Sequence, residues 1–273
     1  MERLSINSFG SWVIDYLLLT PGVKPTVKRL IAIDAANHGD SAVLNREVLP
    51  TKACWPDDSR DILHTLEHFN VQQPVIGIGH SFGGGSMCHA AMMQPDAFVA
   101  TIFIEPILFQ MKEQTEALAK KTLKRRDRWS QTLTSAFERS FEDWDKRQLG
   151  VFLEQGVIPL DEHNMSSGWT LKTPKEQEAA TYLAAPHPQI LHLLQESKRR
   201  HHFIWGSDSF AISAENRQLV ERMVHHPSTT RVVAGAGHLI PMTHPESLSS
   251  IIASILQQTA TGFQTEIPQR FRL

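Results

Sequence analysis

One pentapeptide in the chain has the pattern of a serine nucleophile held on a sharp turn. The segment Gly79-His80-Ser81-Phe82-Gly83 matches Gly-x-Ser-x-Gly, in which the serine stands between a strand and a helix. An apolar run at 75–78 precedes it, and a helical segment rich in small residues, 84–93, follows. Glycines on either side of the serine let the strand and the helix approach closely. We therefore predict that Ser81 is a catalytic nucleophile rather than a structural turn serine.

A serine hydroxyl is a weak nucleophile at neutral pH and needs a general base. His238 is the best-placed candidate, because it follows Gly235-Ala236-Gly237 directly after an apolar run. His80 flanks the serine, and we expect it to line the pocket rather than act as the base. No pair of histidines has convincing metal-ligand spacing and thiols are scarce, so we expect no metal and no cofactor.

Two carboxylates compete for the role of the acid that orients the histidine. Glu105 ends an apolar run in Ile104-Glu105-Pro106, where a charge is costly unless it is paired. Asp208 follows a different apolar run, and either choice preserves the chain order serine, acid, histidine. We favour Glu105 and keep Asp208 as the alternative.

The elements that must position these residues alternate along the chain. Short apolar runs rich in β-branched residues alternate with helical patterns, which is typical of a parallel sheet covered by helices. The predicted strands are Arg29–Ile33, Pro74–Ile78, Val99–Ile104, His202–Trp205 and Thr230–Val233. Each run is almost continuously apolar, as expected of a strand buried on both faces. Ser81 and His238 are then expected to meet at the carboxyl edge of one sheet.

Helix starts are predicted from capping residues. Asp57 or Asp58 is expected to cap one helix and Ser213 another. Thr243 and Glu246 have the spacing of a capping box at the start of the last helix.

The interval between the third and fourth predicted strands is expected to form a helical cap. It contains aromatic and apolar residues spaced as one face of a long helix: Trp129, Leu133, Phe137, Phe141 and Trp144. A cap there would lie over the carboxyl ends of the strands, where open α/β sheets bind ligands. The predicted domains are a core of residues 1–106 and 201–273 and a cap of residues 107–200.

Composition indicates an ordinary globular protein. Hydrophobic residues make up 41% and charged residues 21% of the 273, with a formal net charge of -2, so no basic surface for nucleic acid is expected. Cys54 and Cys88 are too few for a disulfide framework, so we expect reduced thiols in an intracellular protein.

The ends of the chain bear on its location. The first residues lack the apolar core of a signal peptide, and no early apolar run is long enough to span a bilayer. We expect a soluble, cytoplasmic protein with no membrane partner, and a homodimer is compatible with this expectation. Phe271-Arg272-Leu273 shares its last two positions with peroxisomal tripeptides of the Ser-Lys-Leu type, so a peroxisomal location stays an alternative.

These residues together resemble the α/β-hydrolase superfamily. The resemblance is closer to fungal hydrolases associated with toxin and secondary-metabolite biosynthesis, some of them peroxisomal. The matching segments are 31–41, which contains Asn37-His38-Gly39, the pentapeptide at 79–83, 104–106, 171–182 and Gly237-His238. The resemblance implies a helical cap and a small-molecule substrate, with Asn37 and His38 in the substrate pocket. Many such relatives carry an aspartate three residues after the glycine at position 206, where this chain has Ser209.

The resemblance also raises the question of the oxyanion hole. Relatives begin with further strands and a His-Gly-type loop that supplies one backbone N–H donor. Here Asn7-Ser8-Phe9 falls just beyond that loop, so the first strands are expected to be missing or abbreviated. We expect the Phe82 N–H to be one donor; the second either comes from the backbone of Ser8, Phe9 or a nearby residue or is absent. Loss of one such donor lowers rates by about 10²–10³-fold.

Three functions follow in order of preference. The first is a serine hydrolase that cleaves an ester, lactone or thioester of a small, fairly apolar metabolite in fungal secondary metabolism. The second is a lyase or cyclase of the same fold that uses the Ser–His pair for acid–base chemistry. The third is a non-catalytic ligand-binding protein. Hydrolases of this fold that use a carboxylate nucleophile are disfavoured, because position 81 is a serine.

Overall fold

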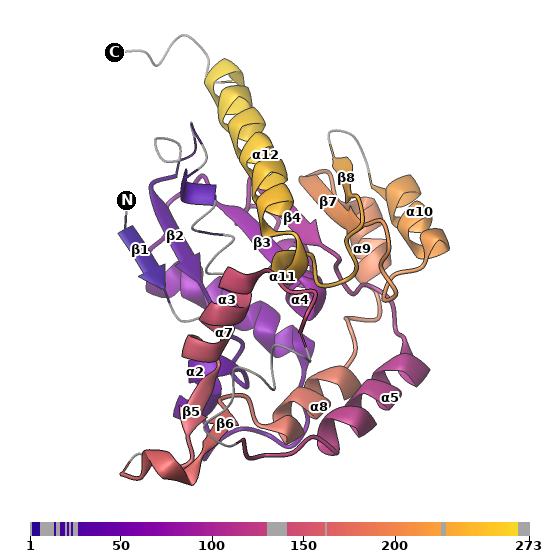
Figure 1. The fold of residues 1–273 in the computed structure, drawn as a ribbon. Helices are drawn as coiled ribbons and strands as arrows, with labels where there is room; N and C mark the ends of the chain where they lie inside the picture. The colour runs from indigo at the N-terminus through magenta and orange to yellow at the C-terminus, as the bar shows by residue number, and fades with distance from the viewer. Residues whose placement is uncertain are drawn as a thin grey trace.

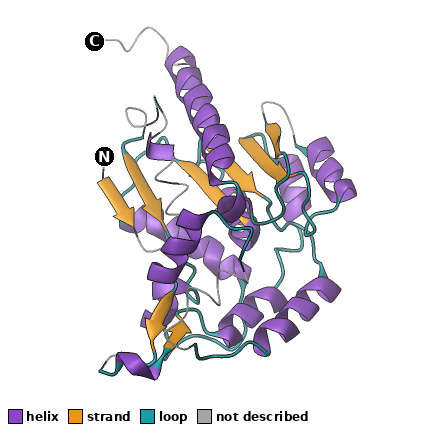
Figure 2. Cartoon of the chain, viewed as in Figure 1, coloured by secondary structure: helices purple, strands orange, loops and turns teal. Residues whose placement is uncertain are grey.

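The computed structural model describes residues 2–5, 14, 17–19, 21, 23, 27–129, 141–161, 163–224 and 228–266. Strands and helices alternate through most of these residues (Figures 1 and 2). Up to the end of the fourth strand, the elements are β1 (Glu2–Ser5), β2 (Arg29–Ala32), α2 (Gly39–Leu44), α3 (Trp55–His68), β3 (Ile76–His80), α4 (Ser81–Met93) and β4 (Ala100–Ile104). The intervening segment, residues 107–200, contains α5 (Lys112–Leu123), α7 (Lys146–Gln155), β5 (Val157–Pro159), η1 (Met165–Ser167), β6 (Trp169–Leu171), α8 (Lys175–Leu183) and α9 (Ile190–Glu196). The remaining elements are β7 (Arg200–Gly206), α10 (Ala214–Met223), β8 (Thr229–Val233), α11 (Ile240–Thr243) and α12 (Pro245–Glu266).

The main sheet has four parallel strands in the order β3-β4-β7-β8. These strands are four of the five predicted from apolar runs, with ends shifted by at most two residues. The fifth, β2, pairs in parallel with β1 in a separate two-stranded sheet. The short strand β1 was not predicted. Because the four central strands run in one direction, the loops after them meet at a single edge of the sheet.

Side-chain alternation along β4 and β7 divides the core into two layers. Phe103, Phe203 and Trp205 belong to the cluster that contains residues of α3, α4, α9 and α10. Ile102 and Ile204 point to the opposite face and belong to the cluster formed with α12. In Figure 1 the long helix α12 crosses one face of the sheet, while α3 and α4 lie on the other. Helices on both faces are what a parallel sheet requires.

Burial on both faces is confirmed only for β4, which is buried throughout, and β7, which is buried except at Arg200. The prediction was wrong for β2, β3 and β8, each of which has partly or fully exposed positions. The physical reason is position in the sheet. The central strands β4 and β7 are covered by helices on both sides, whereas β3 and β8 are the outer strands of this sheet and β2 lies in the separate two-stranded sheet.

The intervening segment is more varied than a purely helical cap. Helices α5 and α8 pack side by side, and β5 and β6 form a short antiparallel pair that was not predicted (Figure 1). The single long helix is wrong at both ends. Trp129 forms an isolated antiparallel bridge with Trp169, and Phe141 and Trp144 precede α7. These last two aromatic rings pack against Phe152 instead of forming a helix face. Leu133 and Phe137 lie outside the described residues.

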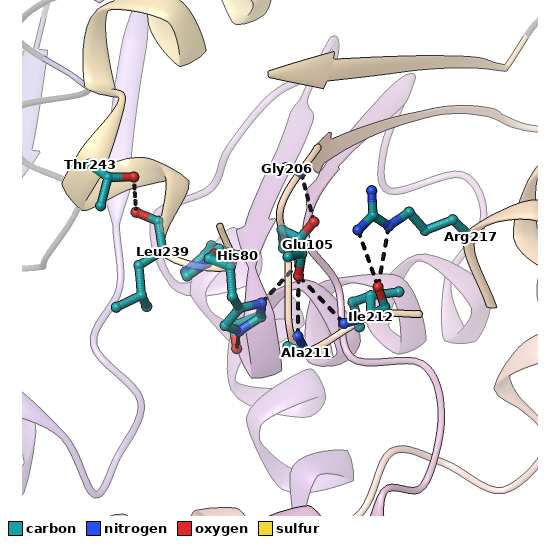
Figure 3. Close-up of polar contacts among 11 residues, drawn as sticks. His80, Glu105, Gly206, Ala211, Ile212, Arg217, Leu239 and Thr243 are labelled. Atoms are coloured by element: carbon teal, nitrogen blue, oxygen red, sulfur yellow. Dashed lines mark hydrogen bonds and ion pairs between the residues drawn. The ribbon is translucent and has the colours of Figure 1, made fainter. Parts of the chain in front are cut away.

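Helix starts follow the predictions unevenly. Ser213 caps α10, with its hydroxyl accepting a hydrogen bond from the Asn216 N–H, as predicted. Helix α3 begins at Trp55, before the predicted caps Asp57 and Asp58. A proline stands in its first turn, where its fixed φ is already helical and its lack of an N–H costs nothing, because an N–H there would have no acceptor within the helix. The predicted capping box of Thr243 and Glu246 was wrong, because Thr243 ends α11 and α12 begins at Pro245. The Thr243 hydroxyl donates instead to the Leu239 carbonyl (Figure 3).

Among the described residues, no helix combines the length and the apolar character that crossing a bilayer requires. The C-terminal residues 271–273, which carry the peroxisomal alternative, lie outside the described residues.

Candidate active site

Ser81 stands at the junction of β3 and α4, in a conformation that few non-glycine residues adopt. Its φ is +55°, in the left-handed region, as expected for a serine on a strained turn. A Cβ at Gly79 would collide with the backbone carbonyl of Gly83, so a side chain is excluded there. We also predicted that Gly83 lets the strand and the helix approach closely. That prediction was wrong, because a Cβ at Gly83 would meet open space. The next two glycines are also tightly packed: a Cβ at Gly84 would lie 3.0 Å from Pro106, and one at Gly85 would lie 2.5 Å from the Ile107 carbonyl oxygen.

His238 lies in the loop after β8, and its imidazole reaches the serine. The distance from His238 Nε2 to Ser81 Oγ is 2.8 Å. The ring is largely buried, with 9% of the residue exposed. The His238 carbonyl accepts a hydrogen bond from His80 Nε2 at 2.8 Å, which fixes the loop from the end of β3. The structure therefore brings Ser81 and His238 into hydrogen-bonding contact.

Glu105 lies directly after β4 and is fully buried. Its φ of +44° is also in the left-handed region, which turns the side chain out of the strand direction. Carboxylate oxygen Oε1 accepts the Gly206 N–H at 2.7 Å (Figure 3). The other oxygen, Oε2, lies 3.1 Å from His238 Nδ1. Burial raises the pKa of Glu105, but the hydrogen bonds from His238, Ser209 and Gly206 outweigh burial and hold the pKa below its ordinary value.

Asp208, the alternative acid, is not part of this arrangement. Its side chain is exposed and accepts a hydrogen bond from the Ser207 hydroxyl at 2.7 Å. Of the two carboxylates, the structure places Glu105 and not Asp208 against the histidine.

The electrostatics of His80 suit a neutral hydrogen-bond donor. Burial, with a further contribution from His238, lowers the pKa of His80 to about 4. A carbonyl can only accept, so the proton of the neutral imidazole sits on Nε2 and points at the His238 carbonyl. His80 therefore contacts the backbone of the His238 loop, while its ring centroid lies 5.2 Å from that of His238.

Asn37 and His38 lie beside the nucleophile turn and under α8. The His38 ring stacks on Phe82 with centroids 5.6 Å apart. His38 Nδ1 lies 2.7 Å from Asn37 Oδ1, and Asn37 Nδ2 donates to Thr181 Oγ1 at 3.0 Å. The Thr181 hydroxyl in turn donates to the Gln177 carbonyl. This chain directs the His38 proton onto Nδ1, so the neutral ring presents Nε2 as an acceptor. Burial lowers the pKa of His38, which favours the neutral ring.

The predicted oxyanion donors are only partly described. Phe82 is the second residue of α4, and the first N–H groups of a helix have no acceptor within the helix. Ser8 and Phe9 lie outside the described residues.

Several residues near the site were not predicted. Ser209 contacts Glu105, and Phe210 lies against the His238 ring with centroids 6.0 Å apart while 80% of the phenylalanine is exposed. Trp55 contacts the Phe82 ring and donates from Nε1 to the Thr181 carbonyl. Position 209 was noted only as the place of a missing aspartate, and no local pattern distinguishes Phe210 or Trp55.

A cavity of about 150 Å³ lies next to the nucleophile turn. Its lining is mixed. Apolar side chains come from the start of α3, the loop after β4 and the end of α8: Trp55, Ile107, Phe109, Met111, Leu183 and Ala184. Polar and charged side chains come from the same loop and from α5: Gln110, Lys112, Thr115 and Glu116. Neither Ser81 nor His238 lines it. The cavity is one residue away from the serine on two sides, because Trp55 touches Phe82 and the Ile107 N–H donates to the Ser81 carbonyl.

Within the described ranges, no group of three or more His, Cys, Asp or Glu side chains is placed to hold a metal ion. Both cysteines are free, Cys88 in the buried part of α4 and Cys54 exposed at the start of α3.

A parallel sheet, a serine on a strand–helix turn and a histidine and carboxylate from later loops together define a hydrolase fold. Residues 7–250 match the alpha/beta hydrolase family, and the chain belongs to that family.

Particular relatives come from fungi. The type I acyl-CoA thioesterase mpaH' of Penicillium brevicompactum is 31% identical over 84 residues, which are 30% of this chain and 19% of that protein. The match thus spans about a fifth of the thioesterase. The abhydrolase domain-containing protein ACTT2 of Alternaria alternata is 25% identical over 217 residues, covering 67% of this chain and 83% of that protein. The solved structure of the peroxisomal alpha-beta-hydrolase Lpx1 of Saccharomyces cerevisiae has a TM-score of 0.77 at 19% identity, covering 96% of this chain and 75% of Lpx1.

Proposed function

We propose that this protein is a serine hydrolase that cleaves an ester, lactone or thioester bond in a small, fairly apolar metabolite. The observation that carries the proposal is the continuous contact from Ser81 Oγ through His238 to Glu105. Membership of the alpha/beta hydrolase family supports it, as does the similarity to fungal proteins such as the Penicillium thioesterase.

The hydrogen bonds determine which proton moves. Ionised Glu105 accepts a hydrogen bond from the His238 Nδ1–H, so Nε2 carries a lone pair toward the Ser81 hydroxyl. Ser81 Oγ attacks the substrate carbonyl carbon, and its proton passes to Nε2. The imidazolium that forms faces a buried carboxylate, and it then protonates the leaving alcohol or thiol. Water, deprotonated by His238, releases the acyl group from Ser81. The Phe82 N–H would donate a hydrogen bond to the oxyanion, and the backbone near Ser8 and Phe9 is the expected source of a second donor.

The cavity beside the turn supports an apolar substituent on the substrate. A volume of about 150 Å³ has room for a small ring or a short alkyl chain, which would lie against the apolar side of the cavity. The names of the Penicillium relatives make thioesters the first substrates to assay.

Labelling with a fluorophosphonate tests the nucleophile directly. In the proposed reaction, Ser81 Oγ attacks phosphorus and fluoride leaves, which adds the phosphonyl group to the protein. We expect stable labelling of the wild type, and none of Ser81→Ala or His238→Ala, with tryptic mapping to Ser81. Asp208→Asn is the matched control and should label at the wild-type rate. Labelling that survives in Ser81→Ala would overturn the assignment.

Hydrolysis is distinguished from lyase or cyclase chemistry by turnover in oxygen-18 water. A hydrolase puts one heavy oxygen into the acid product for each bond cleaved. A product without the heavy oxygen would move the proposal to the lyase or cyclase alternative while leaving the nucleophile assignment intact.

The proposed compartment is the cytoplasm, with the peroxisome as the alternative supported by the name of the yeast relative. Fluorescent fusions with and without residues 271–273 separate the two.

A further inference from the structure

Ser209 lies in the loop after β7, and its hydroxyl contacts the carboxylate of Glu105. Ser209 Oγ is 2.5 Å from Glu105 Oε2, the same oxygen that faces His238 Nδ1. The backbone N–H groups of Ala211 and Ile212 point at Ser209 Oγ, at 3.3 and 3.4 Å (Figure 3). Those N–H groups can only donate, so they occupy the acceptor side of the hydroxyl. The hydroxyl proton is thereby directed at Glu105.

The Glu105 carboxylate depends on these donors because it is fully buried. Oε1 receives the Gly206 N–H, whereas Oε2 receives Ser209 and His238. With 0% of Glu105 exposed, water does not replace a missing donor. Removal of the Ser209 hydroxyl would leave Oε2 with His238 alone. A buried carboxylate with fewer donors takes up a proton more readily and rotates more freely.

We propose that Ser209 is a positioning residue of the active site, whose hydroxyl keeps Glu105 ionised and fixes the orientation in which its carboxylate meets His238. The inference rests on the proposed function and deepens it. Ser209 acts through Glu105, not on the substrate.

The same geometry makes position 209 a second place for the acid. Ser209 Oγ and His238 Nδ1 lie within hydrogen-bonding distance of one oxygen, and β4 and β7 are adjacent strands. A carboxylate on residue 209 would therefore lie within reach of the imidazole. In a Glu105→Gln/Ser209→Asp variant, the Gln amide oxygen can accept the Gly206 N–H while its NH₂ donates to the new aspartate. The remaining aspartate oxygen would face His238 Nδ1.

The first test compares Ser209→Ala with Ser209→Thr, which keeps the hydroxyl. For an ester substrate, we expect Ser209→Ala to lower kcat about ten- to a hundredfold with little change in KM, because one hydrogen bond to a charged group is lost. Ser209→Thr should restore most of kcat. The control is Ser213→Ala, which removes the α10 cap without touching the active site and should leave kcat within about twofold.

The pH profile separates positioning from a general loss of structure. Without its donor, the buried carboxylate takes up a proton more readily, so the inactive, protonated Glu105–His238 pair persists to higher pH. The acidic limb of kcat/KM should therefore move to higher pH in Ser209→Ala. The titratable groups facing Glu105 are His238 and His80. With a pKa of about 4, His80 stays neutral over the assay range, so it does not set this limb. A lower activity with an unshifted limb would indicate misfolding and count against the inference.

Two outcomes overturn the inference outright. The first is a Ser209→Ala protein whose kcat and pH profile match those of the wild type. The second applies if Ser209→Ala fails to fold: Ser209→Cys, whose thiol is a weak donor, then decides. A lowered kcat with an acidic limb moved to higher pH supports the inference, and a wild-type kcat and pH profile refute it. The double variant tests only the proximity of residue 209 to His238.

Failure of the proposed function is recognised separately. The low-field Nδ1 proton resonance of His238, assigned by its absence in His238→Ala, reports the Glu105 contact without any turnover. A shifted titration of this resonance in Ser209→Ala, in a wild-type protein that hydrolyses nothing, would retain the role of Ser209 and reject the hydrolase.

Discussion

Replacing Glu105 by glutamine is the sharpest test of the site, because the structure dictates which way the new amide must face. The Gly206 N–H donates to Oε1 at 2.7 Å, so the Gln oxygen is held at that position. The NH₂ group then takes the place of Oε2, 3.1 Å from His238 Nδ1. An NH₂ group can only donate, so Nδ1 must become an acceptor and the imidazole proton moves to Nε2. In that tautomer, His238 cannot accept the proton of Ser81.

The expected loss follows from this tautomer change. The equivalent amide substitution in a serine protease triad lowers kcat by about 10⁴-fold. We expect a fall of about 10³- to 10⁴-fold here, which corresponds to roughly 4–5.5 kcal/mol in the activation free energy. KM should change little, because the buried Glu105 is not placed to contact substrate.

The assay is kcat and KM for a p-nitrophenyl ester, with burst-phase acylation measured in the same experiment. Asp208→Asn is the control, since the Asp208 side chain is exposed and, among the hydrogen bonds described, contacts only Ser207, while the backbone bond from Asp208 to Ala236 is kept. Its kcat should stay within about twofold. The folded fraction of each variant is checked by urea titration. A folded Glu105→Gln protein with more than a tenth of wild-type kcat, or an equal loss in Asp208→Asn, would refute the assignment of Glu105.

Three further predictions follow from the fold. Burial lowers the pKa values of His201 and His202 to about 4. Between about pH 6.5 and 4 the unfolded chain therefore binds protons that the folded chain does not, so these two histidines destabilise the folded state as the pH is lowered. From pH 7 to 5 the pair should contribute a loss of roughly 3–4 kcal/mol, whereas burial raises the pKa values of Asp34 to about 6 and Asp58 to about 7, which acts in the opposite direction. The test is therefore the difference in urea titration between the wild type and His201→Gln/His202→Gln, and equal pH profiles for the two proteins would contradict these histidine pKa values. Gly79→Ala should destabilise the protein by roughly 1–3 kcal/mol through its clash with the Gly83 carbonyl, while Gly83→Ala should be neutral or stabilising; equal effects would exclude the steric explanation. Ala184→Phe should fill the cavity and lower kcat/KM for hexanoyl esters by about tenfold or more relative to acetyl esters, and an unchanged ratio would show that the acyl group does not enter it.

The contacts among Ser81, Glu105 and His238 could be predicted from the sequence because a local pattern marks each residue. Ser81 follows an apolar strand and precedes small residues, Glu105 ends a buried strand, and His238 follows a Gly-Ala-Gly turn. In a parallel sheet these three positions reach one edge, so the chain order alone brings them near one another.

What the sequence could not predict depends on contacts between distant residues. Ser209 acquires its importance from Glu105, which is 104 residues away along the chain. The aromatic spacing from Trp129 to Trp144 suits a helix, yet Trp129 instead pairs with Trp169 across a β-bridge. A tertiary partner overrides local periodicity in such a case. Gly83 fits the motif, but its surroundings are open, which only the neighbouring backbone reveals.

Thr181 joins α8 to two separate parts of the core. Its hydroxyl accepts from Asn37 and its carbonyl accepts from the Trp55 indole, and both donors are buried. Lifting α8 would break both hydrogen bonds, at a cost of roughly 1–3 kcal/mol. We therefore expect this turn of α8 to stay in place rather than to open and close. The size of the cavity beside the nucleophile turn would then limit the acyl groups that fit. Replacing its lining residues by smaller ones would enlarge it, whereas loosening α8 would not be required.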